Sequence, residues 1–141
     1  PAGSVATLAG LTLGCAIAGM KTKVVGIQIM DSHLGPVEIC TANTGNKLMQ
    51  QALKIIQAQQ PEFIIILPPV ILLRDWYPPG YGVKTLSTDN AVALAASHGL
   101  QLDQTYSGKT FDAFTQALSK TSNPLLYWAT YNSAHTFEKA G

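Results

Sequence analysis

The 141-residue sequence has little charge: Asp, Glu, Lys and Arg make up 12% of it, against 47% hydrophobic residues. A free-standing domain usually carries about a quarter charged residues. The shortage suggests that another part of a protein covers some of the surface. The formal net charge is only +1, and the Lys and Arg residues are scattered. Because nucleic-acid binding needs a concentrated basic surface, we expect no nucleic-acid partner.

Cysteine, histidine and long apolar runs are also scarce. Cys15 and Cys40 lie in apolar surroundings, where free thiols are expected, and this favours a reducing, cytoplasmic setting. The three histidines are far apart and lack metal-ligand spacing, so we expect no metal. The apolar stretch 5–18 has no preceding basic residues, contains glycines and is too short to cross a bilayer. We therefore expect neither a targeting signal nor a membrane partner.

Helical and strand patterns alternate along the chain. We predict helices at 5–19, 45–59 (capped by Asn43 or Thr44), 87–98 (capped by Ser87 or Thr88), 109–120 and 132–139. Continuous apolar runs predict buried strands at 23–30, 63–67 and 124–129, and the Pro- and Gly-rich residues 68–82 predict a long irregular passage. This order predicts an α/β domain with a mostly parallel sheet.

A short glycine loop opens the first predicted helix. It consists of Gly3, Ser4, Val5, Ala6 and Thr7. The free N–H groups and the positive end of the helix dipole can hold a phosphate there, although for the loop taken alone an ordinary Ser or Thr cap is the preferred interpretation. The sequence starts at Pro1, directly before this loop and without a strand to deliver it. We therefore expect it to be truncated at its N-terminus.

Other hydroxyl groups follow predicted strands or lie in the irregular passage. Tyr81 lies between Gly80 and Gly82, Tyr106 and Ser107 precede a glycine, and Thr130 follows the last predicted strand. Each one alone is as well explained as a structural residue. Ligands of open α/β sheets bind beyond the carboxyl ends of the strands, so these groups together favour one site.

Two motifs carry a family resemblance. The run Gly3-Ser4-Val5-Ala6-Thr7-Leu8-Ala9-Gly10-Leu11 resembles the phosphate loop of fold type II pyridoxal-phosphate enzymes. Gly80-Tyr81-Gly82-Val83, followed by Leu102-Asp103 and Tyr106-Ser107-Gly108-Lys109, is similar to the D-cysteine desulfhydrase/1-aminocyclopropane-1-carboxylate deaminase branch. The resemblance implies a three-layer αβα arrangement with helices on both faces of the sheet.

The resemblance also implies residue roles. Backbone amides of Gly3, Ser4, Val5, Ala6 and Thr7 are expected to hold the phosphate of pyridoxal 5′-phosphate. Tyr81 and Tyr106 match the two family tyrosines near the substrate, and Thr130 and Ser107 match positions near the cofactor ring. Val5 and Ala6 replace the usual glycines, so phosphate binding is expected to survive if the loop is already helical.

Ser107 and Thr130 also bear on the substrate. In the deaminases that the chain resembles, the matching element is Tyr-Glu-Gly-Lys, whereas this chain has Tyr-Ser-Gly-Lys. A carboxylate near the pyridine nitrogen of the cofactor deepens the electron sink. The neutral hydroxyls favour a D-cysteine desulfhydrase, which forms pyruvate, hydrogen sulfide and ammonia. A 1-aminocyclopropane-1-carboxylate deaminase is the alternative, and a non-catalytic fragment or degenerate phosphate-binding domain is the alternative of another class.

The resemblance finally implies missing partners. The family's Schiff-base lysine lies upstream of the phosphate loop and is absent from these 141 residues, and Lys109 matches a different family lysine. Residues 1–141 are therefore interpreted as the C-terminal part of an enzyme that is inactive without its N-terminal portion. A small amino-acid substrate and a homodimer are further expectations.

Overall fold

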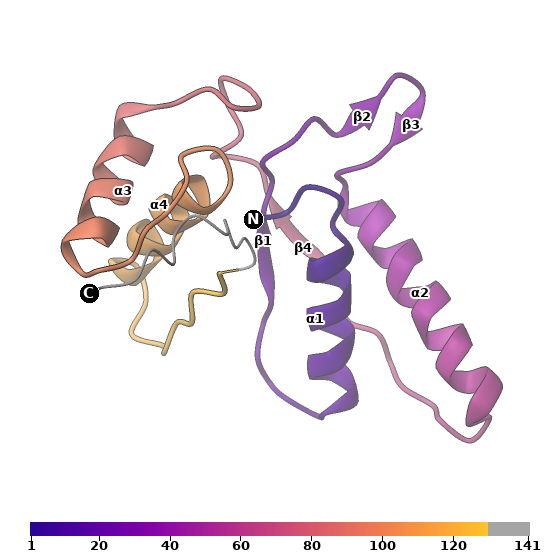
Figure 1. The fold of residues 1–141 in the computed structure, drawn as a ribbon. Coiled ribbons are helices and arrows are strands. Elements are labelled where there is room, and N and C mark those ends of the chain that lie inside the picture. The colour runs from indigo at the N-terminus through magenta and orange to yellow at the C-terminus, as the bar shows by residue number, and fades with distance from the viewer. Residues whose placement is uncertain (130–141) are drawn as a thin grey trace, which may run out of the picture.

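The computed structural model describes residues 1–129. Along the chain its elements are α1 (Ala6–Ile17), β1 (Val25–Ile27), β2 (His33–Leu34), β3 (Val37–Glu38), α2 (Ala42–Gln59), β4 (Ile71–Leu73), α3 (Leu86–Ser97) and α4 (Ser107–Leu118) (Figure 1). β1 and β4 pair in parallel, whereas β2 and β3 form a short antiparallel hairpin. None of the helices within these residues is long and apolar enough to cross a membrane.

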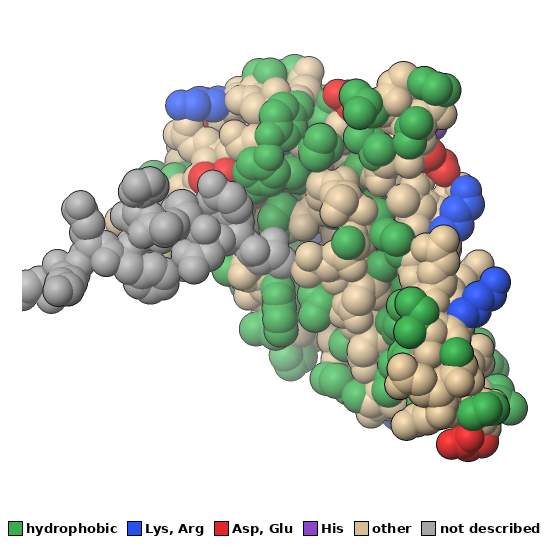
Figure 2. All heavy atoms as spheres, turned by 45° about the vertical axis from the view of Figure 1, so that its right-hand side comes forward, with side chains coloured by type: hydrophobic (Ala, Val, Ile, Leu, Met, Phe, Trp, Pro, Cys, Tyr) green, Lys and Arg blue, Asp and Glu red, His purple; other side chains and the backbone are tan. Residues whose placement is uncertain are grey.

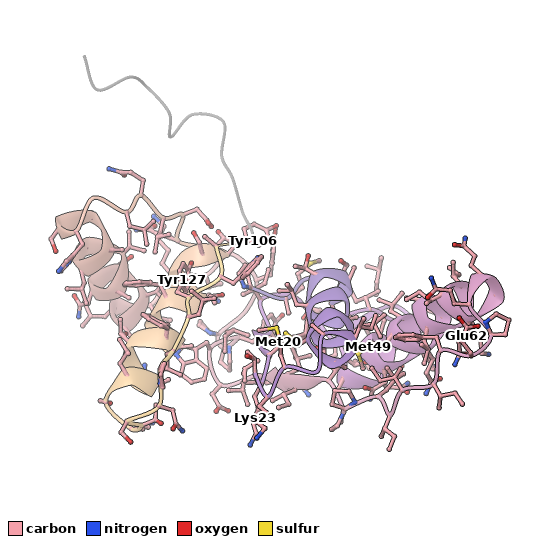
Figure 3. All side chains as sticks on the ribbon, turned by 90° about the horizontal axis from the view of Figure 1, so that it is seen from below. Met20, Lys23, Met49, Glu62, Tyr106 and Tyr127 are labelled. Carbon is pink, nitrogen blue, oxygen red and sulfur yellow. The ribbon has the colours of Figure 1, made fainter. Side chains whose placement is uncertain are left out.

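The helices lie in two pairs around the parallel strands. α1 packs on α2 to one side of β1 and β4, and α3 packs on α4 to the other side (Figures 1 and 3). Ala2 extends the parallel pairing by a bridge to Gln28, at the edge of β1 opposite to β4. The predicted α/β class, with parallel pairing and helices on both sides, is confirmed.

The core forms where α1 and α2 meet the strands. Leu8 and Leu13 of α1 and Met49 of α2 are buried together there. A Cβ at Gly26 of β1 would lie 2.4 Å from Leu8 Cδ2, so the absence of a side chain lets α1 approach the strand closely. This contact holds the start of α1 against the edge of the sheet that carries the candidate site.

Threonine side chains start both α2 and α3. Thr41 Oγ1 accepts a hydrogen bond from the Thr44 amide at 3.0 Å, and Thr85 Oγ1 accepts one from the Thr88 amide at 3.1 Å. The predicted caps, Asn43 or Thr44 and Ser87 or Thr88, are wrong because α2 begins three residues and α3 one residue earlier than expected. Each helix therefore starts with a Thr-x-x-Thr cap.

The predicted strands agree less closely with the structure than the predicted helices do. The strand at 23–30 shrinks to Val25–Ile27, and residues 63–67 and 124–129 form no strand. Ile64 and Ile66 are 88% and 93% exposed, and Leu126 is 80% exposed. β4 forms instead at Ile71–Leu73, inside the passage expected to be irregular. The predicted helix at 132–139 lies outside the described residues.

The surface matches the low charge content. In Figure 2 hydrophobic side chains are scattered among neutral polar ones over the visible face, and the charged side chains are few and lie mostly at its edges. Both cysteines are free thiols; Cys40 is fully buried and donates to the carbonyl oxygen of Ala2, with 3.1 Å between Sγ and O. That contact ties the segment before α2 to the start of the chain.

Candidate functional site

The phosphate-loop candidate leaves the edge of the sheet and turns directly into α1. The Ala2 amide donates to the Ile27 carbonyl at 2.8 Å, and the Ile29 amide donates to the Ala2 carbonyl at 3.2 Å. The following residues, 3–7, donate no backbone N–H to any acceptor within residues 1–129. These amides and the positive end of α1 are therefore available to an anion. Ser4 and Thr7 are exposed and can add hydroxyl donors.

Val5 adopts the conformation of a glycine. Its φ is 55° and its ψ is 3°, in the left-handed region, and α1 begins only at Ala6. The expectation that the loop is already helical is therefore wrong at Val5 and correct at Ala6. A non-glycine residue in this region costs about 1–3 kcal/mol. Burial offsets much of that cost, because the Val5 side chain is 2% exposed and such burial contributes about 1.5–3 kcal/mol.

The two candidate catalytic tyrosines meet in space. Tyr81 lies in the loop after β4 and Tyr106 forms the N-cap position of α4, yet their hydroxyls share a hydrogen bond. Their ring centroids lie 6.0 Å apart at an interplanar angle of 78°. Figure 3 shows Tyr106 on the side of α4 that faces α1. The structure thus places in direct contact two residues that the sequence analysis assigned to one site from separate motifs.

Asp103 holds Tyr106 in place and was not among the predicted site residues. Its carboxylate accepts hydrogen bonds from the amides of Thr105 at 2.9 Å, Tyr106 at 2.6 Å and Ser107 at 3.0 Å. Burial raises the pKa of this carboxyl group, but the hydrogen bonds from Ser107 and the three amides outweigh burial and lower the pKa overall. An aspartate a few residues before a predicted helix is the signal that could have identified it.

We expect Asp103→Ala to lower the free energy of unfolding by about 1–2 kcal/mol at pH 7, because the amides of residues 105–107 before and at the start of α4 lose their acceptor. The folded-state pKa lies below the ordinary value of 3.8. The stabilisation is therefore present above about pH 4 and is lost as pH falls through the folded-state pKa. Urea denaturation at pH 7 and pH 3 measures this. The exposed Asp75→Ala variant is the control, and equal losses at both pH values would contradict the assignment.

The Ser107 hydroxyl is engaged by Asp103. The side chain is 3% exposed, and its hydroxyl donates to the Asp103 carboxylate. The Ser107 carbonyl accepts a hydrogen bond of 3.1 Å from the Tyr127 hydroxyl. Burial, together with the charge of Asp103, raises the pKa of Tyr127 to about 12, so this donor keeps its proton. Ser107 is thus part of the support of α4, and its contact with a cofactor ring stays a prediction.

Both halves of the candidate site are attached to the same strand. α4, which carries Tyr106 at its N-cap position, packs against β1, and Ala2, directly before the glycine loop, pairs with Gln28 at the end of β1. Thr130 lies outside the described residues. Within residues 1–129, no group of three His, Cys, Asp or Glu side chains could hold a metal ion.

Comparisons with known proteins agree on one type of fold. No family model matches the chain. D-cysteine desulfhydrase of Salmonella newport is 28% identical over 84% of this chain, and that of Salmonella paratyphi C is 27% identical over 86%. A crystal structure of an ACC deaminase homologue superposes with a TM-score of 0.67 and 26% identity over 84% of this chain. These matches support the predicted resemblance of this chain to the fold type II pyridoxal-phosphate enzymes.

The similarity covers only part of each fold type II relative. The chain spans 39% and 40% of the two desulfhydrases and 33% of the deaminase homologue. Within this part, residues 3–7 suit the phosphate end of the fold type II cofactor: the amides are free, and at Gly3 a Cβ would come within 3.3 Å of Met30 Sδ. A glycine therefore keeps the backbone close to the strand edge where a phosphate would lie.

Proposed function

We propose that this chain forms the phosphate-binding and tyrosine-bearing part of a pyridoxal-phosphate-dependent lyase that acts on D-cysteine. The observation that carries the proposal is the hydrogen-bonded pair of Tyr81 and Tyr106, and the free amides of residues 3–7 add to it. The similarity to D-cysteine desulfhydrases supports the substrate. The net reaction would convert D-cysteine and water into pyruvate, hydrogen sulfide and ammonia.

Each group would have a separate task. The amides of residues 3–7, with the hydroxyls of Ser4 and Thr7, would hold the phosphate and fix the position of the cofactor. Bound pyridoxal phosphate supplies an electron sink for the substrate's α-carbon. The tyrosine pair would hold one mobile proton between the two Oη atoms and exchange it with the substrate. Because Tyr81 is 47% exposed, a small amino acid could reach the pair from solvent.

The polar groups near the proposed ring position favour thiol elimination over cyclopropane opening. Ser107 carries no charge and its hydroxyl is used by Asp103. Thr130, which we propose contacts the pyridine nitrogen, is also neutral. A neutral partner leaves a weaker electron sink, which suffices when a thiol leaves. A deaminase acting on 1-aminocyclopropane-1-carboxylate is the second candidate, supported by the match to an ACC deaminase homologue.

The proposal requires a partner for this chain. The lysine that bonds the cofactor would come from the portion of the enzyme that corresponds to the unmatched part of the relatives. The 141 residues alone would then bind phosphate without catalysis, and the assembled enzyme would be a homodimer in the cytoplasm. The low charge and the exposed apolar side chains, such as Ile55, Ile64 and Ile66, support burial against such a portion.

The experiment that tests the function is the intact mass of every polypeptide that purifies with this chain, measured after borohydride reduction. We expect a pyridoxyl-phosphate adduct on a lysine outside residues 1–141, together with release of sulfide and pyruvate from D-cysteine. Opening of the cyclopropane ring of 1-aminocyclopropane-1-carboxylate, without release of sulfide from D-cysteine, would favour the deaminase. A 15.0 kDa species without adduct or activity that still binds inorganic phosphate would favour a non-catalytic phosphate-binding domain.

A further inference from the structure

Lys109 is the most buried charged side chain in the described part of the molecule. It lies in the first turn of α4 and is 1% exposed. Its Nζ donates to the carbonyl oxygens of Gly80 at 2.9 Å and Tyr77 at 3.2 Å, and lies 5.9 Å from the centre of the Tyr77 ring. No carboxylate pairs with it within residues 1–129. A buried ammonium group is costly, so these contacts with one loop need an explanation.

The loop that Lys109 contacts is the one that carries Tyr81. It has little apolar anchoring of its own, since Tyr81 is 47% exposed and Val83 is 44% exposed. Gly80 and Gly82, with φ of 152° and 70°, flank the tyrosine in conformations that side chains disfavour. Two glycines give this loop many accessible backbone conformations when it is not held. The hydrogen bond from Lys109 to the Gly80 carbonyl, one residue before Tyr81, restricts those conformations.

The other end of the hydroxyl pair depends on the same helix. Tyr106 occupies the N-cap position of α4, three residues before Lys109. One turn of α4 therefore carries one tyrosine directly and contacts the loop of the other through an ammonium group. A second attachment comes from Tyr77, whose hydroxyl bonds the Asp31 carboxylate just after β1. This bond fixes the loop to the sheet but does not reach the Gly80 carbonyl.

We propose that Lys109 is a positioning residue, which holds the loop so that the Tyr81 hydroxyl meets that of Tyr106. The catalytic consequence rests on the proposed function, whereas the geometric claim does not. The side chain has the reach of four methylene groups and several N–H donors, so it can satisfy two carbonyls at once. Methionine of similar length has no donor. Arginine keeps N–H donors, but they belong to a guanidinium group that is wider than the ammonium group of lysine.

The first test is structural and independent of activity. In Lys109→Met we expect the nuclear Overhauser effects between the rings of Tyr81 and Tyr106 to disappear, and exchange of the Gly80 and Gly82 amides to rise about tenfold or more. Lys109→Arg should restore at least part of both signals. Retained ring contacts in a folded Lys109→Met variant would overturn the proposal. If that variant does not fold, Lys109→Gln, which keeps a shorter NH₂ donor, takes its place with the same expected loss.

The second test uses the assembled enzyme. A misplacement of about 1 Å can cost roughly 100-fold in rate, so we expect kcat of Lys109→Met to fall about that far, with a much smaller change in KM. In a Tyr81→Phe background the same change should have little further effect. Independent, multiplying losses would overturn the positioning role. Loss of the ring contacts in a protein that never acts on D-cysteine would uphold Lys109 and refute the proposed function instead.

Discussion

Gly108→Ala is expected to lower the free energy of unfolding by about 2–3 kcal/mol, the largest single loss of stability that we predict. A Cβ at this position would lie 2.7 Å from the Asp103 carbonyl oxygen and 2.7 Å from Val92 Cγ2. The carbonyl belongs to the backbone and already accepts the Gly108 amide at 2.7 Å, so it cannot move without breaking that bond. The strain would fall on the contact between α3 and α4.

Gly10→Ala provides the matched control, because Gly10 also lies in a helix and a Cβ there meets nothing within 4 Å. This change should stabilise the protein by up to about 1 kcal/mol through helix propensity. Urea denaturation of both variants, followed by circular dichroism, measures the difference. If the two alanines had the same effect, the packing at Gly108 would not have the importance that its distances indicate.

Tyr106→Phe is expected to reduce kcat of the assembled enzyme by roughly 10²- to 10⁴-fold, the range for loss of a proton-transfer group. Tyr81→Phe should fall in the same range, since both hydroxyls belong to one hydrogen bond. The double variant should lose little more than either single variant, because the two groups act as a unit. Steady-state release of pyruvate from D-cysteine measures all three.

Tyr127→Phe is the control for the tyrosine series. It removes a hydroxyl of the same kind that donates to the Ser107 carbonyl and lies outside the tyrosine pair. It should lower stability by about 0.5–1.5 kcal/mol and leave kcat within a few-fold. Additive losses in the Tyr81/Tyr106 double variant, or an equal loss in Tyr127→Phe, would contradict a shared proton between the two site tyrosines.

The helices could be predicted from the sequence because their signals are local. Apolar spacing and a nearby stop are enough to find α1, α2, α3 and α4 to within a few residues. The caps failed because several hydroxyl residues stand side by side, and only the structure shows that Thr41 and Thr85 accept the amide bonds. Composition alone does not rank such neighbours.

The strands and the supporting residues depend on partners that are distant in sequence. An apolar run such as 63–67 becomes a strand only if another strand meets it, and within residues 1–129 none does. Lys109 and Gly80 are separated by 29 residues, so no local pattern connects them. Tyr81 and Tyr106 could be proposed from motif resemblance, whereas their direct hydrogen bond required coordinates.

The first turn of α4 also determines how the site can move. Tyr106 begins this helix and Lys109 donates to the Gly80 carbonyl, while the Tyr77 hydroxyl bonds the Asp31 carboxylate after β1. The loop of Tyr81 is therefore attached to α4 and to the sheet at the same time. A tilt of α4 relative to the sheet would have to break one of these contacts, so the two hydroxyls and the parallel strands are expected to move as one rigid unit.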